Sequence, residues 1–385
     1  MQRRTFLKVL GGAAIVPALS LATGCSTRLP ANATDGWRRP GHESDPRRWI
    51  LSYALLAPHS HNLQSWIADL REPNQINLSC DLSRLLPETA PYARQIMLSH
   101  GTFLELLDIA ARELSLRADI ELFPAGHFGP RALDTRPVAR IRLSPDATVQ
   151  KDLLFAQILR RRTNRNPYDS QRRLPQAAWQ AIVQSPAENA IQIGYVDLAQ
   201  PSLLAQHRQI AAAAWRTELT TPRVVRETYR LLRIGADEIA KHRDGIAILD
   251  SRLVWLDRLG LFDRTQVPTA DSYATQSQLE EFEARLAATP AFFWMSSRGN
   301  DRATQIAAGR AYARVQLTAT AHGVAMQPLQ QALQEYPEQQ SCYRAIHRLC
   351  GADPATHTVQ MWARIGYGPQ VSPSPRRALE QIIRP

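Results

Sequence analysis

Lysine is nearly absent from this 385-residue chain, because only Lys8, Lys151 and Lys241 contribute to its 46 basic residues and arginine supplies the others. The formal net charge of +11 makes nucleic acid one candidate ligand. However, the arginines are scattered, and neither a basic tail nor an aromatic RNA-binding motif accompanies them. The pattern argues against a nucleic-acid partner and favours a general arginine bias together with an anionic ligand.

Cysteine and long apolar runs are also scarce. Cys80 is expected to pack in a strand, while Cys342 and Cys350 could pair in an oxidising compartment or stay free. Their separation fits no metal-binding motif, so the sequence predicts no metal site. Beyond residue 25 no apolar run is long enough to span a bilayer, and the hydrophobic content of 44% is typical of a globular chain.

Residues 1–25 predict an export signal. The basic segment RRTFLK precedes an uncharged run, and its two arginines resemble the twin-arginine signal. Ala22–Cys25 resembles a bacterial lipoprotein cleavage box, which would make Cys25 a lipid anchor; the sequence leaves this modification open. We expect transport by the twin-arginine translocation machinery to the periplasm, either free or as a membrane-anchored lipoprotein. Because that route carries folded proteins, we also expect a cofactor.

The rest of the chain exceeds one ordinary hydrophobic core, which favours two units. We predict a linker over residues 26–46, a first unit over 47–148 and a second over 149–385. Each unit has the order helix, polar elbow, strand, long helix, which indicates an internal duplication and an α+β fold. Residues 221–288 show helical patterns and no strand pattern, and this insertion is long enough to act as a lid.

Apolar periodicity locates the main elements. Helices are predicted near residues 46–57, 94–116, 152–159, 177–182, 203–215 and 304–321. Strands are predicted near residues 66–70, 76–80, 120–123, 138–143, 191–196, 291–296 and 358–365.

The segment APHSHNLQSW (residues 57–66) lies between a predicted helix and a strand. Pro58 lacks a backbone donor, and Ser60 is small enough to permit close backbone approach. Asn62 and Gln64 each offer an amide donor and a carbonyl acceptor, which suits the polar edge of a heterocycle such as a flavin. The alternative is an ordinary capped turn, since the same residue types favour turns.

Two arginine-containing segments are candidate anion sites. In RRTNR, Arg161 and Arg165 can converge on one phosphate and Thr163 adds a hydroxyl donor; the alternative is a solvated basic helix end. Arg376 and Arg377 follow a rigid Ser-Pro-Ser-Pro run and could return to the same phosphate, or they could form a frayed terminus.

A further segment, MQPLQ (residues 326–330), ends a strand. Its backbone N–H groups could point at a ring nitrogen.

Together, APHSHNLQSW, RRTNR, GVAMQPLQQ and the late arginine pair resemble the nitroreductase superfamily of FMN flavoproteins, and in particular its fused, Acg-like branch. The resemblance covers residues 46–377 and implies an α+β fold, normally a homodimer with FMN across the subunit interface. Here the elbow lies in the first unit and the arginine box in the second. The resemblance therefore implies one composite FMN site within a single chain, functional as a monomer.

The resemblance also implies residue roles. Pro58, Ser60, Asn62 and Gln64 would meet the isoalloxazine and ribityl chain, whereas Arg161, Thr163 and Arg165 would hold the ribityl and phosphate groups. Backbone near Pro328 and Leu329 would face flavin N5, and Arg377, with Arg376 behind it, would reach the phosphate.

Because the flavin carries the chemistry, we nominate no catalytic side chain. His59, His61 and His100 are candidate proton donors or simply packed or surface residues. The expected function is two-electron transfer through N5 from an unknown donor to a small-molecule acceptor, an aromatic compound or quinone. The alternative is a redox-silent FMN-storage protein.

Overall fold

The computed structural model describes residues 28–186, 191–353 and 355–384. The predicted export signal and Cys25 lie outside the described residues. No helix of the described part combines the length and apolar character that a membrane crossing requires.

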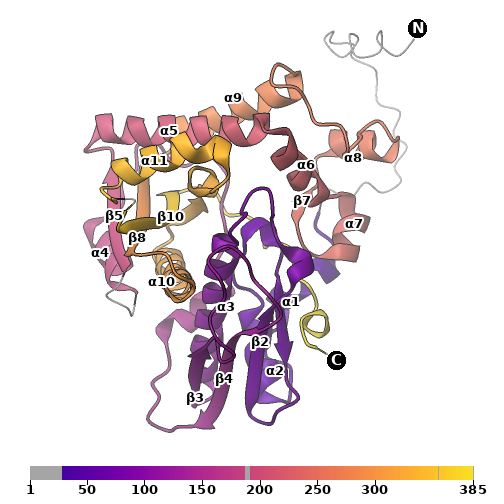
Figure 1. Ribbon diagram of the computed structural model, residues 1–385, viewed down its shortest axis with the longest axis vertical. Helices are drawn as coiled ribbons and strands as arrows, with labels where there is room; N and C mark the ends of the chain where they lie inside the picture. Colours follow the sequence, from indigo (N-terminus) through magenta and orange to yellow (C-terminus); the bar gives the residue numbers. More distant parts are fainter. Residues whose placement is uncertain (1–27, 187–190, 354, 385) are drawn as a thin grey trace.

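The first unit is a four-stranded antiparallel sheet with helices against it (Figure 1). Its strands lie in the order β1-β2-β4-β3. The elements, in chain order, are α2 (Pro46–Ala54), β1 (Trp66–Asp69), β2 (Gln75–Cys80), α3 (Arg94–Glu113), β3 (Leu116–Leu122) and β4 (Pro137–Pro145).

The second unit repeats this plan. Its sheet has the order β5-β8-β10-β9, which is the same order as in the first unit once the strands are renumbered within the unit. This shared topology confirms the α+β fold with two tandem units. The elements are α4 (Gln176–Gln184), β5 (Ile191–Asp197), β8 (Ala291–Arg298), α10 (Arg302–Ala321), β9 (Ala325–Pro328), α11 (Gln340–Leu349) and β10 (His357–Gly366).

Helices α3 and α10 pack side by side where the two units meet (Figure 1). Each has 20 residues, and the eighth is a glycine, Gly101 in α3 and Gly309 in α10. A Cβ atom on Gly309 would lie 1.9 Å from the carbonyl oxygen of Leu98, and one on Gly101 would lie 2.1 Å from that of Ile306. The two backbones therefore touch at a crossing that only glycine permits.

The first residue of each long helix reaches into the opposite unit. Arg94 donates from its Nη atoms to the carbonyls of Gln360 (3.0 Å) and Leu333 (2.7 Å). Arg302 donates likewise to the carbonyls of Tyr92 (2.8 Å) and Pro130 (3.1 Å). These reciprocal contacts join the units in the way that two identical subunits would be joined.

The predicted insertion begins earlier in the chain than residue 221. Between β5 and β8 lie α5 (Pro201–Thr220), α6 (Pro222–Arg230), β6 (Leu232–Ile234), α7 (Gly235–His242), β7 (Ile246–Ile248), α8 (Ser251–Arg258) and α9 (Tyr273–Ala287). The first unit has only the β1–β2 hairpin at the equivalent place. The absence of strands predicted here was wrong, because β6 and β7 form a parallel pair. Each is three residues long, too short for alternation to be visible.

Two other sequence expectations differ from the structure, and one open question is answered. Residues 31–38, predicted to lie in a linker, form a 3-10 turn, η2 (Ala31–Thr34), and α1 (Asp35–Arg38), held by the buried ring of Trp37. The helix predicted over residues 152–159 is only a 3-10 helix, η5 (Leu153–Gln157). Cys342 and Cys350 are free, since eight helical residues separate them by about 12 Å.

A buried acid links the insertion to the second unit. Glu218 of α5 is 5% exposed and accepts a hydrogen bond from Gln334 Nε2 at 2.8 Å, without a cationic partner among the described residues. Burial raises its pKa from 4.5 to about 7, opposed by the Gln334 bond and assisted by Glu227. The folded protein thus holds this proton more tightly than the unfolded chain does.

Replacement of Glu218 by Gln should flatten the pH dependence of stability. Protonated Glu218 stabilises the folded protein fully at a pH below the pKa that this acid has in the unfolded chain. This stabilisation is lost as the pH rises through about 7, the pKa of Glu218 in the folded protein. The thermal midpoint of the native chain should therefore fall more than that of Glu218→Gln between about pH 5 and about pH 8. Exposed Glu280 on α9 supplies the control, Glu280→Gln, and parallel curves for all three proteins would contradict this assignment.

Candidate functional site

The elbow between α2 and β1 has an unusual backbone. His61, Asn62 and Gln64 all have positive φ angles, of 49°, 54° and 53°. Such angles are uncommon outside glycine and persist only where surrounding contacts hold them. One holding contact is the bond from Thr102 Oγ1 of α3 to the carbonyl of Pro58 (2.7 Å). A strained turn of this kind is a frequent feature of functional sites.

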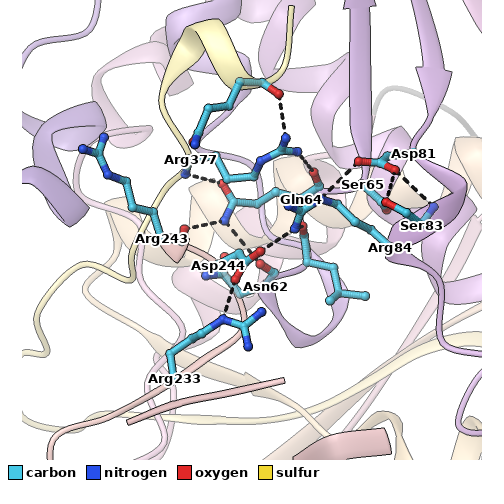
Figure 2. Close-up of polar contacts among 12 residues, drawn as sticks. Asn62, Gln64, Ser65, Asp81, Ser83, Arg84, Arg233, Arg243, Asp244 and Arg377 are labelled. Atoms are coloured by element: carbon cyan, nitrogen blue, oxygen red, sulfur yellow. Dashed lines mark hydrogen bonds and ion pairs between the residues drawn. The ribbon is translucent and has the colours of Figure 1, made fainter. Parts of the chain in front are cut away.

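The side chain of Gln64 lies at the centre of a polar network that joins three parts of the chain (Figure 2). It is fully buried, and its Oε1 accepts from the backbone N–H of Arg377 at 2.8 Å. Its Nε2 donates to the carbonyls of Arg243 (3.0 Å) and Asn62 (3.2 Å). Both ends of the amide are therefore used within the protein, which differs from the predicted contact between Gln64 and a flavin.

Asn62 is likewise bound to the C-terminal segment. Its Oδ1 accepts from Arg376 Nη1 at 2.6 Å, and its Nδ2 donates to the carbonyl of Pro375 at 3.1 Å. Arg376 also donates from Nη2 to the carbonyl of Leu56 at 3.1 Å, and Arg377 donates from Nη1 to the carbonyl of Gln64 at 3.0 Å. The sequence predicted that the elbow and the late arginines lie close together, and they do. However, the two guanidinium groups bind the elbow directly and are not directed at a phosphate.

Asn62→Ala should therefore act on stability. The change removes both bonds to the C-terminal segment and leaves the buried Arg376 guanidinium short of an acceptor, at a cost of about 1–3 kcal/mol. We expect a lower thermal midpoint than in Asn77→Ala, a control that loses only a 3.3 Å bond to Gln75 on β2. If the two variants have the same thermal midpoint, Asn62 does not hold the C-terminal segment in place.

The insertion contacts the elbow through its turn at residues 243–245 (Figure 2). The carboxylate of Asp244 is 2% exposed and pairs with Arg84, and with Arg233 Nε at 2.8 Å. The backbone N–H of Gly245 donates to the carbonyl of Asn62 at 3.2 Å. The insertion is thus fastened to Arg84 of the first unit by an ion pair, and to the elbow by the hydrogen bonds of Arg243 and Gly245.

Arg161 enters from the second unit and lies buried against the end of α2. Its Nη2 donates to the carbonyl of Leu56 at 3.0 Å and its Nη1 to Gln316 Oε1 at 3.3 Å. Its Nε has no partner, and no carboxylate pairs with it among the described residues. Burial lowers its pKa to about 10, partly offset by Tyr312, whose buried hydroxyl also lacks a partner.

Three guanidinium groups lie around the ring of Trp37. The guanidinium carbons of Arg162, Arg376 and Arg161 lie 4.5, 5.0 and 5.4 Å from its centroid. The electron-rich ring face stabilises cations that have no acidic partner in the described part of the chain. The burial of Trp37 was not predicted, because this residue lies in a segment rich in Pro, Gly and Arg that has no periodic pattern of apolar residues.

Arg165 ends the RRTNR box and is the best candidate for a free anion ligand. Its side chain is exposed and forms no hydrogen bond or ion pair with any described residue. Desolvation nevertheless lowers its pKa, followed by repulsion from Arg285. Burial, then the charge of Arg165, lowers the pKa of His61. The bond from Arg161 Nη2 to the carbonyl of Leu56 brings the arginine box against the end of α2, next to the elbow.

Thr163 lies between the two predicted arginines of the box. It is half-buried, and no described residue bonds to its hydroxyl. Asn164 donates its backbone N–H to the carbonyl of Met326 at 3.0 Å, which places the box beside β9.

Comparison with known proteins finds similar nitroreductases. A "Putative NAD(P)H nitroreductase" of Mycobacterium tuberculosis, found in strains H37Rv and CDC 1551, is 28% identical over 354 residues, which are 89% of this chain and 92% of the relative. This chain is similar to these nitroreductases over nearly its whole length. No family model matches the sequence.

Solved nitroreductases resemble part of the chain. The FMN and NADPH-dependent nitroreductase NfnB of sphigopyxis sp. strain HMH covers 60% of this chain and 97% of its own length, with 15% identity and a TM-score of 0.36. NfnB of Mycobacterium smegmatis, solved with NADPH, covers 58% and 93%, with 18% identity and a TM-score of 0.35. The two mycobacterial relatives, in contrast, match nearly the whole chain.

One further buried cation, Arg364, was not predicted from the sequence. Arg364 on β10 is fully buried, donates to Gln327 Oε1 (2.6 Å) and to the carbonyl of Asn166 (2.8 Å), and leaves Nη1 without a partner. Its guanidinium carbon lies 4.0 Å from the ring centroid of Tyr168. Burial lowers its pKa, and the charges of Arg285 and Arg165 lower it further, so Arg364 belongs to the same cationic region. The only sequence signal is one arginine within an apolar strand.

The backbone predicted to face flavin N5 is engaged elsewhere. Leu329 donates its N–H to the carbonyl of Trp362 at 2.8 Å, and Pro328, which has no N–H, is paired with Ala363 in the sheet. Neither residue offers a free backbone donor, because β9 pairs with β10 up to this point. The N–H of Leu329 is therefore taken up within the sheet, and the role predicted for the backbone near Pro328 and Leu329 stays a prediction.

The three histidines near the elbow are neutral. Both ring nitrogens of His59 have partners, Ser65 Oγ (2.7 Å) and the Ser60 carbonyl (2.8 Å), and burial lowers its pKa to about 3. His100 is fully buried on α3, and burial lowers its pKa too. Burial, then Arg165, lowers the pKa of His61 to about 4, and its Nδ1 lies 3.3 Å from Ser60 Oγ. Of the three, His61 is the one placed to face a ligand.

Two clefts lie away from these residues. The larger, of about 420 Å³, is formed by residues 87–92 and 335–340 with Arg223, and the smaller, of about 240 Å³, lies beside Asp108 and Arg310. Neither includes a predicted site residue. No cluster of His, Cys, Asp and Glu in the described ranges could hold a metal ion.

Proposed function

We propose that this chain is an FMN-binding oxidoreductase of the nitroreductase type. One observation carries the proposal: cations without carboxylate partners gather where the arginine box of the second unit faces the elbow of the first. Arg161 and Arg364 are buried there with unpartnered N–H groups, and Arg165 forms no bond to any described residue. Buried charges are ordinarily paired, so an anion is the missing partner.

The donor set fits the phosphate end of FMN. Arginine presents paired N–H groups that match phosphate oxygens, and the hydroxyls of Thr163 and Tyr312 are additional unpartnered donors. We assign the phosphate and ribityl chain to Arg165, Arg161 and Thr163.

The ring end differs from the sequence prediction. Asn62 and Gln64 are committed to the C-terminal segment, so the ring would lie against the elbow backbone near Ser60 and His61. When bound, FMN supplies the two-electron chemistry. The chain orients it, holds its negative charge beside guanidinium groups and presents the neutral imidazole of His61, which can take up or release a proton.

The relatives suggest the reaction. Proteins named NAD(P)H nitroreductase match nearly the whole chain, and we extend that reaction type to it, with a small nitroaromatic compound or quinone as acceptor. We further propose export through the twin-arginine pathway to the periplasm, free or anchored at Cys25. Because reduced nicotinamide is cytoplasmic, the donor would then be a different reductant, such as a quinol.

A single anaerobic experiment tests the proposal. The purified chain should contain one FMN per monomer, bleach on mixing with NADPH or a quinol, and regain colour with a nitroaromatic compound or quinone. Bound flavin that no donor bleaches would favour the storage protein instead. A flavin-free chain that does not take up FMN would overturn both. Sedimentation should show that flavin binds to the monomer, because one chain carries both halves of the site.

A further inference from the structure

The insertion carries an exposed apolar surface that no feature of the flavin site explains. Trp255, Leu256, Leu259 and Leu261, on α8 and the turn after it, are 51%, 37%, 64% and 59% exposed. The opposite side of α8 is anchored by Val254, which is 6% exposed and packs with Leu232 and Ile234. Helix α8 is therefore apolar on its inner side and again on its outer side, which is unusual for a surface helix.

Arginine and aspartate side chains both border this surface, which we call the α8 patch. Arg252 and Arg258 on the same helix are exposed, and Arg258 lies 3.6 Å from Asp237, an almost fully exposed residue. The chain as a whole has a formal net charge of +11. Apolar side chains with Trp among them, bordered by arginine, are the composition of surfaces that lie in the headgroup region of an anionic bilayer.

The start of the described chain lies on the same part of the molecule. Asn32 of η2 donates from Nδ2 to the carbonyl of Ala240 in α7 at 3.5 Å, and α7 and α8 both pack on β6. In Figure 1, α7 and α8 project from the side of the molecule, away from the two sheets. Only five residues lie between Cys25 and Ala31, and the six steps of extended chain reach about 20 Å at most. A lipid on Cys25 would thus hold this subdomain close to a membrane.

We propose that the α8 patch docks on the surface of an anionic phospholipid bilayer, with its four apolar side chains at the boundary between headgroups and acyl chains. A second protein chain is the weaker occupant, because four side chains on one short helix supply far less than the roughly 800 Å² per partner of a stable interface. Shallow insertion into lipid needs only such a small surface. The proposal goes beyond the flavin site and does not depend on it.

Vesicle binding tests the proposal on the full mature chain with Cys25→Ser, which removes any lipid anchor. The probes are vesicles of phosphatidylethanolamine with phosphatidylglycerol. The double variant Trp255→Ser and Leu259→Ser should have a partition coefficient for vesicles that is lower by about tenfold or more. The reason is that each substitution removes the favourable free energy of transferring an apolar side chain into lipid. The matched control is Leu153→Ser, which removes a leucine that is 92% exposed on η5 and should leave binding unchanged.

A second measurement is independent of vesicle pelleting. Brominated lipids should quench tryptophan fluorescence in the parent chain and much less in Trp255→Phe. Equal binding by the double variant and the control, or equal quenching in both proteins, would overturn the proposal. It would also be overturned if the parent chain were a dimer without lipid and the double variant a monomer, since the patch would then bind a second copy. Unchanged thermal midpoints show that the exposed substitutions leave the fold intact.

Discussion

Arg165→Ala is expected to yield a folded protein that has lost most of its flavin. Arg165 forms no bond to any described residue, so its removal leaves the fold without a broken contact. It would, however, remove a charge-assisted bond to phosphate, worth about 1.5–3 kcal/mol, or roughly 10- to 150-fold in FMN affinity. The measurement is flavin content after purification, followed by titration of the apoprotein with FMN.

Two further variants separate charge from geometry at this position. Arg160→Ala removes an exposed arginine from the same loop and should retain flavin. Arg165→Lys keeps the positive charge but loses the paired donors, so its affinity should fall between those of the parent and Arg165→Ala. Full flavin retention by Arg165→Ala would contradict the assignment of the phosphate to the arginine box.

The long periodic elements could be predicted from the sequence. Helices α3 and α10 show a sustained helical pattern of apolar residues, and both were placed to within a few residues. The two-unit plan was predictable because the same order of elements recurs. The strands β6 and β7 could not be found, because three residues cannot display a period. Trp37 was missed because its packing depends on arginines that lie far away in the chain.

The candidate site was predictable as a meeting of segments but not in its bonds. The sequence joined Asn62 to Arg376, 314 positions apart, through a shared cofactor, whereas they bond directly. Positive φ angles at the elbow turn its amides towards the tail, and no local pattern reveals that turn. Arg364 is a single charge within an apolar strand. Its role could not be predicted because its partners, Tyr168 and Gln327, lie far from it in the sequence.

The close crossing of α3 and α10 supports the flavin site as well as the fold, since it fixes the position of one unit against the other. Gly309→Ala should be severely destabilising. The new Cβ would lie 1.9 Å from the carbonyl oxygen of Leu98, and its nearest neighbours are backbone atoms of α3 that cannot rotate away. The two helices would have to separate along their contact, at a cost of about 3 kcal/mol or more.

That cost is a large part of the 5–15 kcal/mol that typically stabilises a folded protein. Thermal unfolding should show a midpoint lower by several degrees, or the variant should not accumulate in soluble form. Gly101→Ala should behave alike, because its Cβ would meet the Ile306 carbonyl at 2.1 Å. Gly129→Ala is the control, since nothing lies within 4 Å of a Cβ there. If Gly309→Ala and Gly129→Ala have the same thermal midpoint, α3 and α10 do not cross in close backbone contact. The position of the arginine box beside the elbow would then lack this structural support.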